Sequence, residues 1–305
     1  MTGIVGIYQR WPTREACIGH LENVRWGERP LCPYCGAEKI ARHRELTRDD
    51  RWQCQRCLKS FSVTVGTIFH KSHIDLQRWF LLISLMLTAK KGLSSMQAAR
   101  TLEMRQPTVW SMMHRVRRAL ADGGQLLRGL VEMDETYVGG KPRGRNRRSD
   151  DPPGGQGVST KEPVAGAVER KGRVKMRAIS RNAMTSPDMD ALVKSMIDPK
   201  ASVLHTDEYP GYARVNRFMP HRTISHSQQF VADDLFNPVY GRSHTNSIES
   251  VWAIVKRAIY GQYHHVSRRY LPLYLDEITY RFNRRAEKKP SIDGILHLAV
   301  KPQSG

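Results

Sequence analysis

Apolar side chains between residues 75 and 121 recur at the three- and four-residue spacing of amphipathic helices. The first helix can be capped by Asp75, and its apolar stripe comprises Leu76, Trp79, Phe80, Ile83 and Leu87. Ser94 and Gln97 form a capping box that starts a second helix. The pattern predicts a helical region, to which we assign residues 71–126.

A third helix is predicted from Pro107, which suits the first turn of a helix, to Leu120. Its apolar stripe comprises Val109, Met112, Met113, Val116 and Leu120. The opposite stripe comprises Thr108, Ser111, Arg115 and Arg118. Small polar and guanidinium groups on one helix face are typical of a helix-turn-helix domain, so Arg115 and Arg118 are candidate DNA-binding residues. A plain helical bundle with a basic face is the alternative.

Downstream of Gly129 the pattern changes to short strands that alternate with helices. Strands are predicted over residues 130–138, 162–170, 173–180 and 222–227, and in the segment 201–212, which runs into a turn. Helices are predicted from Pro187 to about Ile197, from about Thr245, and over about 270–284. This order is that of a ribonuclease H-like core. It predicts a mixed α/β domain over residues 127–290, followed by a C-terminal tail over 291–305.

Three acids occupy positions in this domain at which ligand sites form. Asp134 lies within the first strand, Asp207 at the end of the fourth, and Glu249 on the closing helix. Carboxylates that are brought together repel one another unless cations neutralise them, so a metal site is favoured. Oxygen ligands suit Mg²⁺ or Mn²⁺ better than Zn²⁺, and two such ions can act on a phosphodiester.

Neighbouring side chains offer alternatives to these three acids. Glu135 follows Asp134 on the opposite face of the strand, so we expect it to point away from the site. Glu208 lies one residue beyond a strand end and is expected to begin a turn. We interpret His205 and His244 as supporting or structural residues, because a site for a hard cation does not require imidazole.

Four of the five cysteines lie in one window near the N-terminus. They form two CxxC pairs separated by 18 residues: Cys32, Cys35, Cys54 and Cys57. This spacing is typical of a structural Zn²⁺ site with four thiolates. Two disulfides are the alternative, which a reducing compartment disfavours. We assign residues 1–70 to an N-terminal segment and zinc ribbon, with a pair of strands over 61–69.

The net charge of the chain indicates the kind of partner that it binds and does not indicate its fold. The 305 residues carry a formal net charge of +20, which favours a polyanion such as DNA. Apolar residues make up 40% of the chain, and its length suits two or three domains. The longest apolar run, 79–89, is too short to span a bilayer, and the N-terminus has no apolar signal segment. These features predict a cytoplasmic protein that does not bind membranes.

The segment 141–148, KPRGRNRR, contains five basic residues and no acid. Repulsion among like charges is expected to keep it extended until it binds DNA, so it is predicted to be a mobile arm. Lys141, Arg143 and Arg145 are therefore candidate DNA-binding residues. A solvated surface loop is the alternative.

Several segments closely resemble the DDE transposases of bacterial insertion sequences that carry an N-terminal zinc ribbon. The resemblance covers residues 14–285 and includes LVEMDETYVGGK, KEPVAGAVER and LHTDEYPGY. Its most specific part is HTNSIESVWAIVKRAIYGQYHHVSRRYLPLYLDEITYRFNRR, residues 244–285. The resemblance implies that Asp134, Asp207 and Glu249 form a metal-binding catalytic triad, with Lys256 as a partner that contacts DNA.

Helical spacing supports this assignment on the closing helix. Glu249 and Lys256 are seven residues apart, about 20° off two full turns, and Asn246 lies near the same line. We expect Lys256 to face the phosphate backbone and Asn246 to bond a carboxylate or a phosphate. A solvated helix face is the alternative for Glu249 and Lys256, and an N-cap or structural amide for Asn246.

The resemblance implies a transposase that binds the terminal inverted repeats of an insertion sequence, cleaves the DNA and joins its ends to target DNA. Double-stranded DNA is the expected partner, and a homo-oligomer is expected to assemble on it. Two alternatives remain open. One is a ribonuclease H-fold nuclease without strand transfer. The other is a domesticated DNA-binding regulator.

Overall fold

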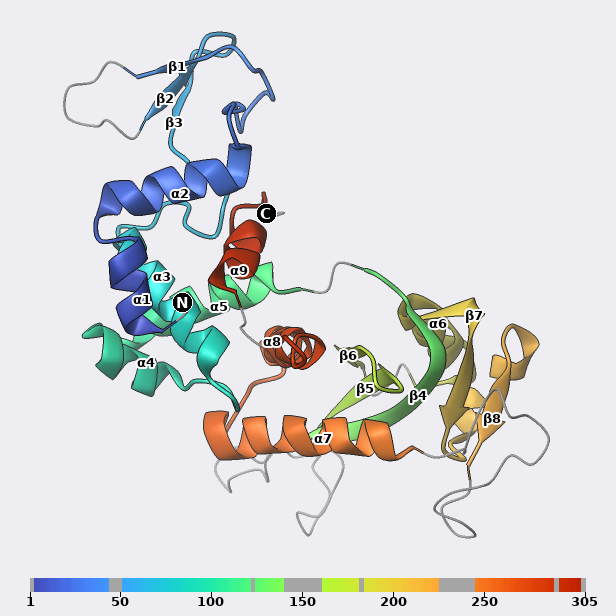
Figure 1. Cartoon of the computed structure of the whole chain (residues 1–305). Helices are drawn as coiled ribbons and strands as arrows, with labels where there is room; N and C mark the ends of the chain where they lie inside the picture. The colour runs from blue at the N-terminus through green and yellow to red at the C-terminus, as the bar shows by residue number, and fades with distance from the viewer. Residues whose placement is uncertain are drawn as a thin grey trace, which may run out of the picture. The chain divides into compact units, whose positions relative to one another are not determined.

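The chain forms two compact units in a computed structural model (Figure 1). The structure describes residues 3–43, 51–121, 124–139, 161–180, 184–224, 245–287 and 291–302. Unit 1 combines Met1–Leu120 with Glu287–Gly305, and unit 2 is Ala121–Ala286. Among the described residues, no helix has the length and hydropathy that a membrane span requires.

Unit 1 begins with two helices and a small antiparallel sheet. The helices are α1 (Ile4–Arg10) and α2 (Arg14–Trp26). The sheet has the order β1-β2-β3 and consists of β1 (Ile40–Arg42), β2 (Trp52–Cys54) and β3 (Ser60–Phe61). The Thr13 hydroxyl accepts a hydrogen bond from the Ala16 N–H and so caps α2. The sheet is the ribbon predicted from the cysteine spacing.

The pair of strands predicted over residues 61–69 is wrong beyond β3. The chain turns after Phe61, and the Thr67 hydroxyl donates to the Thr64 carbonyl at 2.7 Å. Gly66 adopts a positive φ of 74°. The hydroxyls of Ser62, Thr64 and Thr67 bond nearby groups and stabilise turns instead of strands.

The remaining helices of unit 1 are α3 (Leu76–Thr88), α4 (Ser95–Leu102), α5 (Gln106–Ala119) and α9 (Ile292–Ala299). The first three are the predicted helices. The Ser94 hydroxyl accepts from the Gln97 N–H at 3.1 Å, as its capping role requires. The segment expected to be a tail instead contains α9, whose apolar face is buried in unit 1: Ile292, Ile295, Leu296 and Ala299.

Unit 2 contains a five-stranded sheet with the order β6-β5-β4-β7-β8. Its strands are β4 (Leu127–Val138), β5 (Glu162–Glu169), β6 (Val174–Ala178), β7 (Ile197–Thr206) and β8 (His221–Thr223). β4, β5 and β6 are antiparallel neighbours, whereas β7 runs parallel to both β4 and β8. The mixed α/β class is confirmed.

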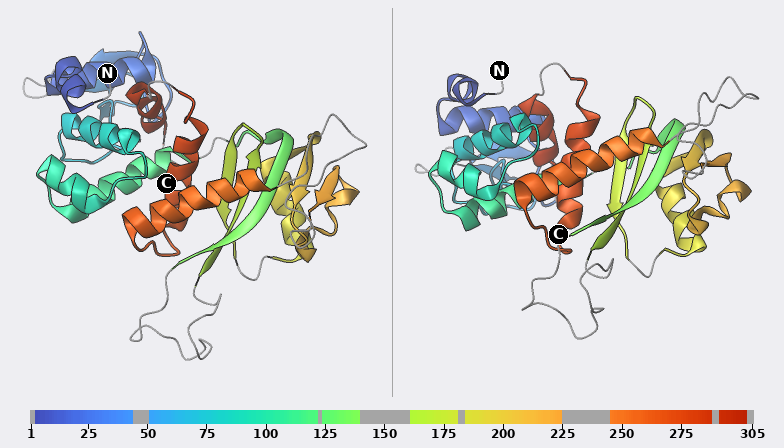
Figure 2. Two further views of the ribbon diagram at one scale, coloured as in Figure 1. Left: turned by 60° about the horizontal axis from the view of Figure 1, so that its bottom comes forward. Right: turned by 90° about the horizontal axis from the view of Figure 1, so that it is seen from below.

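Helices cover both faces of this sheet. They are α6 (Ser186–Met196), α7 (Asn246–Ala258), which continues into a π-helical turn at Ile259–Tyr263, and α8 (Leu271–Asn283). Two 3-10 turns, Pro210–Tyr212 and Val215–Arg217, lie between β7 and β8. Apolar residues of α7 and α8 pack on one face, and those of α6 and the 3-10 turns pack on the other. Figure 2 shows α7 lying along the sheet.

Candidate functional site

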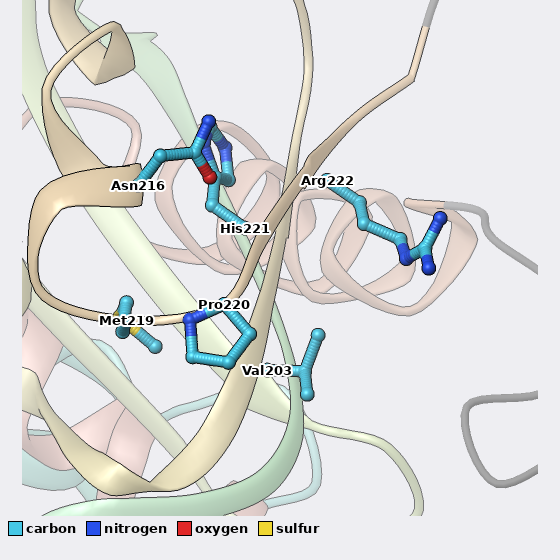
Figure 3. Close-up of a pocket in the computed structure, with 6 residues that line it drawn as sticks. All are labelled: Val203, Asn216, Met219, Pro220, His221 and Arg222. Carbon is cyan, nitrogen blue, oxygen red and sulfur yellow. The ribbon is translucent and has the colours of Figure 1, made fainter. Parts of the chain in front are cut away.

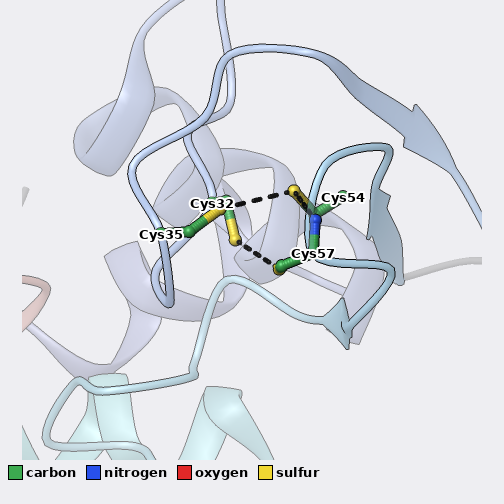
Figure 4. A group of neighbouring side chains, drawn as sticks. All are labelled: Cys32, Cys35, Cys54 and Cys57. Carbon is green, nitrogen blue, oxygen red and sulfur yellow. Dashed lines mark hydrogen bonds between the residues drawn. The ribbon is translucent and has the colours of Figure 1, made fainter.

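The four predicted zinc ligands meet at one point of unit 1 (Figure 4). The sulfur atoms of Cys32 and Cys57 are 3.7 Å apart, as are those of Cys35 and Cys54. The backbone N–H groups of Cys57 and Arg56 each point at the Cys54 sulfur from 3.4 Å, which lowers the pKa of Cys54 to about 6. Four clustered sulfurs, one of them favoured as a thiolate, fit a structural Zn²⁺ ion.

A second cluster forms in unit 2 at the end of β7, beside the parallel strand β4. Glu132 on β4 pairs with His205 on β7. Two residues further along the chain come Asp134, within β4, and Asp207, directly after β7, so the register brings these two acids side by side. Asp134, Asp207 and Glu135 each offer a carboxylate oxygen, and these atoms lie within 4.8 Å of one another.

The expectation that Glu135 points away from this cluster is wrong. Its position on β4 is on the opposite face from Asp134, but its longer side chain reaches the other two carboxylates. The Tyr212 hydroxyl donates a hydrogen bond to it. Burial raises the pKa of Glu135 to about 7, and the charges of Asp134 and Asp207 act in the same direction. Strand alternation fixes the direction of a Cα–Cβ bond but not the reach of a flexible side chain.

Asp134 is held in place by two donors. The Trp252 indole N–H and the Glu135 backbone N–H both donate to its carboxylate at 2.8 Å. Burial raises the pKa of Asp134, and the negative charges of Asp207 and Glu249 raise it further. Glu249 is on α7, the helix whose Trp252 bonds Asp134, and its carboxylate is not among the three that lie within 4.8 Å of one another.

The donor set fits a hard divalent cation. All of the converging groups are carboxylates, and Asp134 already experiences the repulsion that a cation would remove. Of the other candidates, Glu208 is exposed, and His205 is buried with its Nδ1 atom 3.3 Å from the Arg170 guanidinium. His244 lies outside the described residues.

The exposed face of α7 carries the remaining candidates of this region. Asn246 is the first residue of the helix after its N-cap, Thr245, and Glu249 lies in the first turn. Lys256 lies in the last turn. The side chains of these three residues are exposed, whereas Thr245 and the opposite stripe of α7 are buried.

The candidate DNA-binding arginines of α5 differ in their surroundings. Arg118 is exposed. Arg115 is half-buried, donates a hydrogen bond to the His70 carbonyl and lies 5.6 Å from the centroid of the Trp79 ring. Burial lowers the pKa of Arg115, and the nearby Arg118 charge lowers it further. Arg115 thus contributes contacts within unit 1. Lys141, Arg143 and Arg145 lie outside the described residues.

A recess of about 530 Å³ lies beside β8 (Figure 3). Its lining residues are Val203, Asn216, Met219, Pro220, His221 and Arg222. None of them belongs to the acid cluster, and we assign no role to this recess.

Sequence reasoning missed two residues that contact the acid site or its helix. Trp252 is buried and bonds Asp134, and Glu132 is fully buried beside the start of α7. The sequence does contain a signal for Trp252: the indole N–H of a buried tryptophan needs a hydrogen-bond acceptor, and Asp134 is one. Glu132 shares its predicted strand face with Asp134, and α7 packs on that face.

Comparisons with known proteins match the two parts of the chain that contain these clusters. The family model of the ISXO2-like transposase domain matches residues 126–283, and that of the transposase zinc-ribbon domain matches residues 12–60. A relative from Halobacterium salinarum, described as an uncharacterized protein in transposable element ISH50, is 26% identical over 284 residues. That alignment covers 90% of this chain and 92% of the relative.

A chain in the structure of a simian T-cell lymphotropic virus intasome in complex with PP2A regulatory subunit B56 gamma gives a TM-score of 0.27 at 14% identity. The match covers 56% of this chain and 57% of that chain, and at this TM-score it supports no argument. The transposase domain model, by contrast, extends over more than half of the 305 residues. The chain therefore belongs to the ISXO2-like transposase family.

Proposed function

We propose that this protein binds the terminal inverted repeats of an insertion sequence and catalyses metal-dependent DNA cleavage and strand transfer in the cytoplasm. The observation that carries the proposal is that the carboxylates of Asp134, within β4, and Asp207, directly after the parallel strand β7, lie side by side. Glu249 lies in the first turn of α7, the helix whose Trp252 bonds Asp134. The strand order β6-β5-β4-β7-β8, with β4 at the centre of the sheet and β7 parallel to it, supports the proposal of a ribonuclease H-like core.

In this proposal Asp134, Asp207 and Glu249 hold Mg²⁺ or Mn²⁺, and Glu135 is close enough to assist them. Bound divalent ions would supply positive charge that activates the attacking oxygen and stabilises the leaving one. Water first attacks the phosphodiester at the element end, and the 3′-oxygen leaves as a hydroxyl. That 3′-hydroxyl then attacks the phosphorus of a target phosphodiester, and the bond from this phosphorus to the target strand's own 3′-oxygen breaks, so that this oxygen leaves as a hydroxyl. Because two ends must be joined to one target, copies of the chain act as a homo-oligomer on DNA.

A single gel assay separates this function from its two alternatives. Full-length protein is incubated with Mg²⁺, target DNA and DNA carrying the inverted repeats that flank its reading frame. Joined product supports the transposase. Cleaved but unjoined product would indicate a nuclease, and a mobility shift without either product would indicate a DNA-binding regulator.

We further propose that α5 reads the terminal repeat, with Arg118 and Arg115 facing DNA. Replacing both by alanine should weaken binding to the repeat, by about 1–3 kcal/mol for an arginine that contacts a base. Filter binding to the repeat and to unrelated DNA measures affinity and selectivity. The cleaner single variant is Arg118→Ala, because Arg115 also bonds the His70 carbonyl. Undiminished, equally selective binding by the double variant would place sequence readout elsewhere.

The basic segment 141–148 lies outside the described residues, and its role as an arm is proposed from its charge. Replacing its five basic residues with serine should flatten the salt dependence of DNA binding. Each lost phosphate contact lowers the magnitude of the log–log salt slope by about 0.9. Affinities measured from low to moderate salt test this, with zinc content as the control for folding. An unchanged slope would identify the segment as a solubilising loop.

A further inference from the structure

The carboxylate of Glu132 joins strand β4 to the first turn of helix α7. It is fully buried and accepts hydrogen bonds from the backbone N–H groups of Ser247, at 2.8 Å, and Ile248, at 3.2 Å. The Ser247 hydroxyl donates to it at 2.9 Å, and Arg170 at 2.8 Å. A negative group at a helix N-terminus satisfies N–H groups that lack partners within the helix. Here the capping group comes from the strand that carries Asp134.

A second attachment lies one turn further along α7. The Trp252 indole donates to Asp134 at 2.8 Å. Gly166 on β5 pairs with Asp134, and a Cβ atom added at Gly166 would lie 2.5 Å from Cη2 of Trp252. The indole ring therefore occupies space that exists only because this residue of β5 is glycine.

The two attachments lie on either side of Glu249 in the sequence. Ser247 and Ile248 precede it, and Trp252 follows it by three residues. Both attachments end on β4, at Glu132 and Asp134. Sliding a helix by one residue moves its side chains by about 1.5 Å, a large displacement for a metal ligand. The two contacts thus set the position of Glu249 relative to Asp134.

We propose that Glu132 and Trp252 are positioning residues that hold α7 against β4, so that Asp134 and Glu249 can bind the same divalent ions. This inference rests on the proposed function, which supplies the role of those acids. Glu132 sets the start of the helix, and Trp252 orients the Asp134 carboxylate. A purely structural role would make these residues matter for thermal unfolding but not for ion affinity.

The test measures Mn²⁺ affinity of the full-length protein by electron paramagnetic resonance, beside its thermal unfolding midpoint. Glu132→Gln and Trp252→Phe should each weaken Mn²⁺ binding by about tenfold or more, because the first removes the charge and one accepting oxygen of Glu132 and the second removes the donor to Asp134. They should also raise the Mn²⁺ concentration that half-maximal DNA cleavage requires. The control is Gly261→Ala, because an added Cβ there meets no atom within 4 Å.

Variants at Gly166 of β5 distinguish a positioning role of Trp252 from a role in packing alone. Gly166→Ala should displace the indole, lowering both the unfolding midpoint and Mn²⁺ affinity. Combining it with Trp252→Phe makes room for the added methyl group, so stability should recover while Mn²⁺ affinity stays low.

Mn²⁺ affinity within twofold of wild type in folded Trp252→Phe protein would overturn the inference, and so would recovery of that affinity in the double variant. If Glu132→Gln does not fold, Trp252→Phe decides alone. A wild-type protein that neither cleaves nor joins DNA would refute the proposed function, while the Mn²⁺ titrations would still test the positioning role.

Discussion

Asp134→Asn, Asp207→Asn and Glu249→Gln should each reduce DNA cleavage and joining by about a thousandfold or more, while DNA affinity stays close to that of wild type. Each change replaces a charged oxygen ligand with a neutral amide of nearly the same shape. A thousandfold loss corresponds to about 4 kcal/mol of transition-state stabilisation. The loss is expected because each residue would hold the ions that stabilise charge on the reacting phosphate.

The measurement is a joining assay on terminal-repeat DNA, run beside a mobility-shift assay that reports binding. Glu208→Gln is the matched control, since Glu208 neighbours Asp207 but is exposed at the turn. Asp134→Asn is especially informative, because the amide oxygen can still accept from Trp252 and the local packing is kept. An Asp134→Asn protein that joins ends at a rate near wild type would remove Asp134 from the catalytic assignment.

The cluster of aspartates was predictable because each surrounding element has its own periodic pattern. The strand predicted over 130–138 lies within β4, and the acid of the segment 201–212 directly follows β7. The parallel register then brings Asp134 and Asp207 together. Local sequence and the common order of strands were sufficient for this step.

The structural features that the sequence did not predict depend on how far side chains reach and on contacts between residues that are distant in the sequence. Glu135 was expected to point away because strand alternation describes only where a side chain starts. The bond from Trp252 to Asp134 joins residues 118 positions apart, and no periodicity reports it. Helix α9 was missed because its eight residues have a short apolar pattern that becomes meaningful only when the helix packs in unit 1.

Removal of zinc should unfold the ribbon of unit 1. Its strands contain three, three and two residues, and the buried members of its apolar core are Cys32, Cys54 and Phe61. Two of these three residues are themselves predicted ligands, so little apolar core remains to stabilise the sheet without the metal. Zinc binding supplies about 10–16 kcal/mol of apparent free energy in small structural sites, which is folding free energy when the apo form is unfolded.

Elemental analysis should find about one zinc per chain in the purified protein and much less in a Cys54→Ser/Cys57→Ser variant. Limited proteolysis should then cut that variant within residues 32–61, and chelation of wild-type protein should expose the same sites. Cys17→Ala is the matched control, because Cys17 is a buried residue of α2 outside the cluster. Zinc content that is unchanged in the double variant would show that these cysteines do not hold the metal. Resistance of the zinc-free ribbon to protease would show that its apolar contacts are sufficient without it.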